Sequence, residues 1–134
     1  MTDFWNKTLE GVEDIREIPP GRYLGYVSGY KLEVTQDNKP FAVLEFKARE
    51  ALSGQDLEGV ELNRVLRSSR LYFTDAAAKY SKAALKKIDP DLNDKIPAKE
   101  AIEGLVGYDV KFDYKAEKSR DGKEYMNVAS WIAA

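Results

Sequence analysis

Alternation of apolar and polar residues at a period of two runs through the end of the chain, in 107–115 and again in 124–132. This period is typical of strands that bury one face. The segment between the two runs contains Asp121-Gly122, a dipeptide that favours the tight turn of a β-hairpin. The sequence therefore predicts that the chain closes on an antiparallel hairpin with aromatic side chains along its strands and cations near its turn.

Three further strands are predicted upstream, at about 22–34, 41–48 and 60–73. Gly25 and Gly29 interrupt the first of these strands, and a glycine inside a strand is typical of a bulge or a sharp bend. In the second strand, one face carries Ala42, Leu44 and Phe46 and is predicted to meet the core. The alternation of the third strand slips near Ser68-Ser69, which predicts a bulge at that point.

Two helices are predicted between the third strand and the closing hairpin. Apolar residues at helical spacing predict the first over 76–88, while Pro97 and Gly104 are start and stop signals for a shorter second helix. The fold class expected from this order is mainly β: a five-stranded Greek-key barrel of the OB type, with a helical insert between strands three and four. Such a barrel binds oligonucleotides with one sheet face and the loops after its first and fourth strands.

The chain divides into a short N-terminal segment and one domain. Residues 1–18 place Trp5, Leu9, Val12 and Ile15 at helical spacing, which predicts a short helix or an arm, and 19–134 form the predicted OB domain. Net charge is −2, but residues 1–20 hold five acids and two bases and so contribute −3. The remaining residues therefore sum to +1, and a nearly neutral body can still carry a basic groove.

Composition argues against several function classes. Among 134 residues there is no cysteine and no histidine, which removes thiolate chemistry, the commonest general base and the commonest metal ligand. No phosphate-binding glycine-rich loop is present, so we expect no enzyme, no cofactor and no metal site. No apolar run is long enough for a membrane span and the N-terminus lacks the pattern of a signal peptide, so a cytoplasmic protein is expected.

Three stretches resemble bacteriophage single-stranded DNA-binding proteins that have an OB-fold: 18–23, 39–46, and the closing segment from Gly107 to Val128. The resemblance is one of layout and spacing and covers roughly residues 18–132. It implies binding of single-stranded DNA without strong sequence preference, during phage replication or recombination in the infected bacterial cell. Replication or recombination proteins would then be further partners.

Rings on the sheet are the first set of candidate binding residues. In the last strand, Tyr125, Asn127 and Trp131 share a parity opposite to that of Val128, and we expect them to face outward as a stacking platform with a polar partner. Phe41 lies on the face of its strand opposite Leu44 and is a further candidate for stacking on a base.

Cations are the second set, because arginine and lysine contact phosphates. Some lie beside the loop after the first strand, some on the third strand, and some along or near the closing hairpin. The candidates are Lys31, Lys39, Lys47, Arg64, Arg67, Arg70, Lys111, Lys115, Lys118, Arg120 and Lys123. A bulge near Ser68 would bring Arg67 and Arg70 together despite their spacing of three.

Two alternatives remain open at this point. The outward face with Tyr125 and Trp131 would also suit an OB-fold interaction module that forms a homodimer or binds a partner protein. The loop 89–100 places oxygen-bearing side chains at the spacing of a calcium-binding loop and ends in Glu100, although Asp94 stands where such loops have glycine. A calcium-binding domain is therefore the other alternative.

Overall fold

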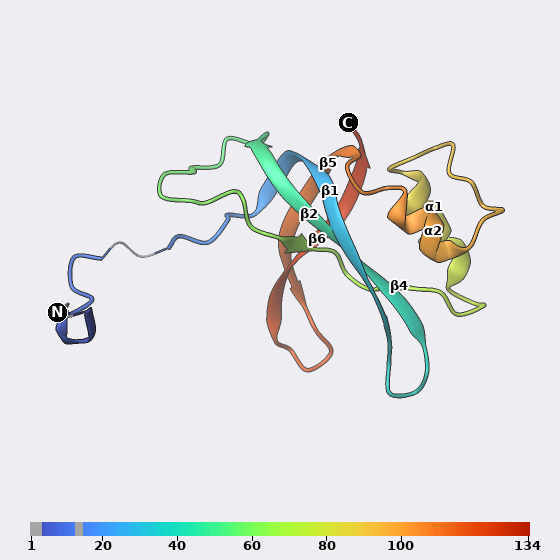
Figure 1. Ribbon diagram of the computed structural model, residues 1–134, viewed down its shortest axis with the longest axis horizontal. Coiled ribbons are helices and arrows are strands. Elements are labelled where there is room, and N and C mark those ends of the chain that lie inside the picture. The colour runs from blue at the N-terminus through green and yellow to red at the C-terminus, as the bar shows by residue number, and fades with distance from the viewer. Residues whose placement is uncertain (1–3, 13–14) are drawn as a thin grey trace.

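The structure is a computed structural model that describes residues 4–12 and 15–134. After a single 3-10 turn, η1 (Phe4–Asn6), the chain forms its strands and helices in the order shown in Figure 1. They are β1 (Gly21–Val34), β2 (Pro40–Ala51), β3 (Leu66–Arg67), β4 (Leu71–Tyr72), α1 (Ala78–Lys86), α2 (Ala98–Glu103), β5 (Asp109–Lys118) and β6 (Glu124–Ala133).

The strands form one open antiparallel sheet of six strands, in the order β3-β2-β1-β5-β6 with β4 also paired to β2. A mainly β fold is thereby confirmed, and the helices do lie between the third-strand region and the closing hairpin. The sheet does not close into a barrel, so the predicted five-stranded Greek-key barrel of the OB type is not confirmed. One parallel bridge between Ser68 and Val128 brings the two ends of the sheet together at a single point, but no continuous ladder closes them.

The predicted third strand is replaced by two strands of two residues each, β3 and β4. Ser68 causes this interruption, because its side chain enters the hydrogen-bond ladder. The amide of Leu44 donates to Ser68 Oγ at 3.0 Å, and the Ser68 hydroxyl donates to the carbonyl of Ser69 at 2.8 Å. A side chain that takes the place of a backbone acceptor interrupts regular pairing. The predicted slip near Ser68 is therefore confirmed as a break in the strand.

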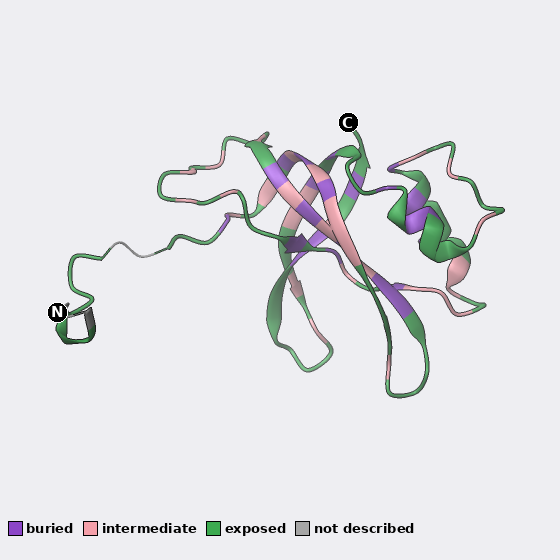
Figure 2. Cartoon of the chain, viewed as in Figure 1, coloured by how far each residue is buried: buried purple, intermediate pink, exposed green. Residues whose placement is uncertain are grey.

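The core lies between the inner face of the sheet and the two helices. Ala42, Leu44 and Phe46 of β2 are buried as predicted. The ring of Phe46 packs 5.4 Å from Phe112 of β5 and 5.4 Å from Trp131 of β6, measured between centroids. Figure 2 shows buried residues along the crossing strands and on the helix face that meets them.

A bulge in β1 lets two residues of different parity reach this core. The register against β2 shifts between Val27 and Gly29, so Val27 pairs with Phe46 while Tyr30 pairs with Leu44. Gly25 serves a different purpose, because a Cβ at that position would lie 2.1 Å from the carbonyl oxygen of Lys47. Glycine permits this close approach, through which β1 bends to pair with both β2 and β5.

The helices end close to where the sequence predicts. The first begins two residues later than expected and ends two residues earlier, and the second has Pro97 at its N-cap and Gly104 at its C-cap. Leu85 and Ile102 are the buried contacts of α1 and α2 with the core. None of the helices in the described part of the chain has the length and apolar character that a bilayer crossing requires.

The N-terminal segment leaves the sheet on the side away from the two helices (Figure 1). It is rooted where Arg16 bridges to Val60 and pairs with Asp56 at 3.3 Å, and Ile18 is buried just after this point. Beyond η1, the described residues before Arg16 form no helix, so an arm describes them better than a helix does. The predicted domain boundary at residue 18 remains a prediction.

Candidate nucleic-acid interface

A groove runs between the tips of two hairpins and across the segment from β3 to β4. In Figure 1 the β1–β2 and β5–β6 hairpins extend from the same side of the sheet. One part of the groove has a volume of about 650 Å³ and includes Lys39, Arg70 and Arg120. The adjoining part, of about 630 Å³, shares Arg70 and Tyr72 with the first and extends to Tyr125. These volumes fall within the range of ligand-binding pockets.

The tips of both hairpins are fixed by local hydrogen bonds. In the first, the amide of Lys39 donates to the hydroxyl of Thr35 at 3.0 Å, and the amide of Thr35 donates to the carbonyl of Lys39 at 3.0 Å. In the second, the amide of Ser119 donates to the carbonyl of Lys123 at 2.8 Å, and Gly122 has the positive φ of 82° that glycine favours. The predicted turn at Asp121-Gly122 is therefore confirmed.

Arg70 is the central cation of the groove because it lines both of its parts. Its guanidinium carbon lies 4.4 Å from the centroid of the Phe41 ring, and its Nη1 donates to the Tyr72 hydroxyl at 3.4 Å. Stacking on a ring holds the guanidinium without neutralising its charge. Among the described residues, neither Arg70 nor Arg120 forms an ion pair, so both retain charge for an anionic ligand.

Two other cations of the groove have acidic neighbours. Arg67 lies 3.6 Å from Glu45. It lines the same part of the groove as Arg70, as the sequence predicted from the slip near Ser68. Lys39 lies 3.3 Å from Asp37. A hydrogen bond from the Thr35 hydroxyl, together with Lys39, lowers the pKa of Asp37, so this carboxylate stays negative at one edge of the groove.

Two exposed or half-exposed tyrosines supply the aromatic surface. Tyr125 is 42% exposed on the tip half of β6, and Tyr72 is partly exposed in β4 with its ring 5.7 Å from that of Phe41. Val43, Ser68 and Asn127 complete the floor between them. Bases stack on rings of this kind whatever their sequence, while neighbouring cations contact phosphates.

The prediction that Trp131 and Phe41 are exposed rings available for stacking on bases is wrong. Trp131 is only 5% exposed, and its Nε1 donates to the carbonyl of Ala84 at 2.9 Å. The cause is a bulge in β6: Asp113 pairs with Ser130 whereas Tyr114 pairs with Val128, so Ala129 is the extra residue and both Val128 and Trp131 face the core. Phe41 is buried beneath Arg70 and supports the groove from below.

Asn127 differs from its prediction in one respect. It lines the groove beside Tyr125, as expected, but it is 8% exposed and so belongs to the floor rather than to an open platform. The register places Lys115 directly opposite Asn127, and Lys31 directly opposite Val43, so both lysines flank the floor. Opposed residues in an antiparallel ladder project on the same face.

The remaining predicted cations lie outside the groove lining. Arg64 faces Glu17 at 3.5 Å, and Lys111 lines a separate small pocket beside Arg22. Three more lie on the strands or in the hairpin loop without lining the groove: Lys47, Lys118 and Lys123. Their placement follows from strand alternation and from the twist of each hairpin, which charge counting does not capture.

Sequence reasoning did not single out Tyr72, Ser68 or Val43 as groove residues. The signal for Ser68 was present in the broken alternation around it. Tyr72 sits in a segment whose parity resets at that break, and its exposure depends on the pairing of β4 with β2, in which it faces Phe41. A pattern of period two cannot assign a face across a break.

The calcium alternative finds no assembled ligand set. Asp94 pairs with Lys82 at 2.8 Å, and Asp89 accepts hydrogen bonds from the amide of Asp91 and the hydroxyl of Tyr108. Across the described ranges 4–12 and 15–134, no group of three or more acidic side chains is placed to hold a metal ion. The loop instead closes one side of an apolar pocket between the helices.

Comparison of the sequence with protein-family models finds no match, and comparison with curated proteins finds no significant match.

Proposed function

We propose that this protein binds single-stranded DNA without strong sequence preference, in the groove between its two hairpins. The observation that carries the proposal is that Arg70 and Arg120, which form no ion pair within the described part of the chain, line one continuous groove together with Tyr72 and Tyr125. Cations track a phosphate backbone, and rings stack on successive bases. The amide side chain of Asn127 on the floor adds hydrogen-bonding groups that do not select one base.

The sheet topology supports a relationship to the OB type. In that fold the ligand lies across one sheet face between the loops that follow strands one and four. Here the loops at 35–39 and 119–123 flank the groove, and the Ser68–Val128 bridge lies where such a barrel would close. We infer an OB-type fold whose third strand is too short and broken to complete the barrel.

A titration with fluorescently labelled oligo-dT, followed by anisotropy, tests the proposal. A labelled oligonucleotide is preferred to protein fluorescence because Trp131 is buried away from the groove. If four cations contact phosphates, the logarithm of the binding constant should fall with the logarithm of salt concentration with a slope of about −3. Oligo-dT, oligo-dC and a mixed sequence of equal length should bind with similar affinity.

The matched variants are Arg70→Ala and Arg64→Ala. Both remove one exposed arginine, but Arg64 lies outside the groove and faces Glu17. Weakened binding of Arg70→Ala alone would support the groove as the binding site. A chain that binds no oligonucleotide at low salt would overturn the proposal and favour an interaction module instead.

A further inference from the structure

The N-terminal arm presents large apolar side chains that no other described residue covers. Trp5 is 98% exposed and Leu9 is 84% exposed, and Val12 and Ile15 are also exposed. Figure 2 colours the described part of this projecting segment as exposed. Isolated apolar residues on a surface are ordinary, but several along one short projecting segment are typical of a contact with another molecule. The arm is therefore a candidate for one side of a protein–protein interface.

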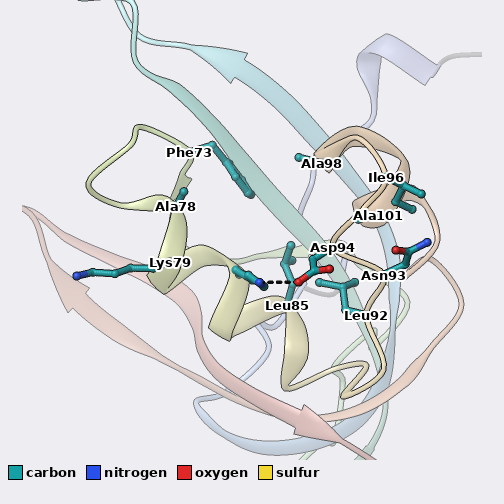
Figure 3. Close-up of a pocket in the computed structure, with 11 residues that line it drawn as sticks. Phe73, Ala78, Lys79, Leu85, Leu92, Asn93, Asp94, Ile96, Ala98 and Ala101 are labelled. Atoms are coloured by element: carbon teal, nitrogen blue, oxygen red, sulfur yellow. Dashed lines mark hydrogen bonds and ion pairs between the residues drawn. The ribbon is translucent and has the colours of Figure 1, made fainter.

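An apolar groove of matching character lies on the opposite side of the molecule, next to the helices. One part is a pocket of about 250 Å³ between α1, α2 and the loop that joins them, lined by Phe73, Leu85, Leu92 and Ile96 (Figure 3). A second hollow of about 260 Å³ shares Phe73 and Ala98 with it and continues over the exposed Leu32 and Val34. Together they form a continuous apolar path, which we call the helix-side groove.

The arm and the helix-side groove also match in charge. Residues 1–20 contain five acids and two bases, whereas the groove lining holds three lysines, at positions 79, 82 and 99, and two acids, Glu33 and Asp94. Lys82 bonds to Asp94 at 2.8 Å across the pocket, and the dashed line in Figure 3 marks this pair. The Lys82–Asp94 pair and the Lys99–Glu103 pair cancel charge, so Lys79, which forms no ion pair among the described residues, is the lysine that attracts an acidic segment, and apolar contacts hold the segment in place.

The arm and groove of one chain face away from each other. The root of the arm is fixed by Arg16 and Ile18 at the end of the sheet away from α1 and α2 (Figure 1). We propose that the arm of one copy docks in the helix-side groove of a second copy, with Trp5 as the anchor in the pocket. This contact uses two different surfaces, so it can repeat from copy to copy. It goes beyond the proposed function and does not rest on it.

Two variants separate the two halves of the contact. Trp5→Ala removes the anchor from an exposed position. Ala98→Glu places a charge and added bulk where the two parts of the groove meet, at the exposed first residue of α2, where an acidic side chain suits the helix dipole. Neither variant should change the melting temperature of the dilute protein. Ile132→Ala is the matched control, because Ile132 is an exposed apolar residue outside both surfaces.

Sedimentation velocity on the full chain, without nucleic acid and at low salt, is the decisive measurement. The wild type and Ile132→Ala should associate as concentration rises, while Trp5→Ala and Ala98→Glu should each remain monomeric. An equimolar mixture of the two defective variants should form one-to-one complexes, because one supplies an intact arm and the other an intact groove. Trp5 emission should shift to shorter wavelength as the wild type associates.

Three outcomes would overturn the proposal: a wild type that stays monomeric at the highest concentration, a Trp5→Ala variant that associates like the wild type, or a mixture that stays monomeric. A blue-shifted Trp5 emission that does not depend on concentration would also overturn it, since the arm would then be covered by its own chain. Because no oligonucleotide is present, failure here is distinguishable from failure of DNA binding.

Discussion

The two halves of β6 belong to different parts of the molecule. The half near the hairpin tip carries Tyr125 and Asn127 into the groove, whereas the other half carries Trp131 into the core. One extra residue, Ala129, separates them and changes which face each parity presents. The same strand therefore builds the interior at one end and a candidate binding surface at the other, and a single bulge decides which ring does which.

The difference extends to the charges around each half. Near the core end, Arg22 donates to Asp113 through Nε at 3.0 Å, and Ser130 donates to the same carboxylate at 2.9 Å. Near the tip, Arg70 lies on a ring and Arg120 is exposed. Pairing with an acid stabilises local geometry and cancels charge, while stacking on a ring preserves charge. Cations at the two ends of the sheet are thus suited to different tasks.

The largest effect is expected from Trp131→Ala. Removal of a buried ring that packs against Phe46 and bonds to Ala84 should lower the free energy of unfolding by about 3–5 kcal/mol. Urea denaturation would measure this loss. At a temperature where the variant is still folded, its affinity for oligo-dT should equal that of the wild type. A folded variant with much weaker binding would place Trp131 in the interface after all.

Tyr125→Ala should show the reverse pattern. If the exposed ring stacks on a base, its removal should weaken oligo-dT binding by about 1–3 kcal/mol. The melting temperature should change little, because Tyr125 lies on an exposed tip. Tyr125→Phe is the control and should retain most of the affinity, since the ring rather than the hydroxyl does the stacking. Equal losses in both variants would contradict a stacking role.

Much of this division was predictable from sequence where alternation is uninterrupted. The core face of β2, the turn at Asp121-Gly122 and the limits of α2 at Pro97 and Gly104 all follow from local chemistry. Even the break at Ser68 was visible as a slip in the pattern. Local signals suffice in these places because turn residues and half-buried strands restrict the backbone in the same way in any fold.

The bulge at Ala129 left no such signal. No glycine marks it, and both possible registers place an aromatic or apolar residue inward. Tertiary contacts select the observed register. Trp131 packs on Phe46 and donates to the carbonyl of Ala84, and both partners lie far from it in the sequence. The face of Trp131, and with it the composition of the groove, therefore depends on packing that alternation alone does not encode.

Arg70→Ala tests whether the free charge near the hairpin tips contacts phosphate. Loss of one phosphate contact should reduce the magnitude of the salt slope by about 0.7 and weaken binding by about 1 kcal/mol at low salt. Arg64→Ala should leave both quantities unchanged, because Arg64 is outside the groove lining. Anisotropy titrations at several salt concentrations give both values. An equal change in slope for the two variants would mean that the groove does not direct binding.

Acid pH should reduce the stability that Asp113 contributes near the core end of β6. The hydrogen bond from Arg22, with help from Ser130, lowers the pKa of Asp113. A lowered pKa contributes stability that is present above the unfolded value of about 3.9 and is lost as pH falls through the folded value. Asp113→Asn should therefore melt below the wild type at pH 6, by no more than about 4 °C because the pair is half exposed.

This difference in melting temperature should narrow as the pH falls below about 4, where the carboxyl of the unfolded wild type takes up a proton, and should close below the lowered pKa of the folded Asp113. Calorimetry at a series of pH values would follow it. Asp75→Asn is a matched control, since Asp75 is exposed and forms no ion pair among the described residues. A gap between Asp113→Asn and wild type that stays constant with pH would show that the ionised carboxylate is not the stabilising form.

The smallest effect concerns the tip of the other hairpin. Asp37 keeps a negative charge at the groove edge, because the Thr35 hydroxyl and Lys39 lower its pKa. It therefore opposes a phosphate backbone and partly neutralises Lys39.

Asp37→Asn should tighten oligo-dT binding by about twofold at low salt, with the gain lost at high salt because the charges are exposed and screened. Asp91→Asn makes the same change in net charge in the loop between α1 and α2, outside the groove lining, and so separates a local effect from a global one. Equal tightening in both variants would reduce Asp37 to a contribution to overall charge, and tightening in Asp37→Asn alone would fix this hairpin tip as the second wall of the binding groove.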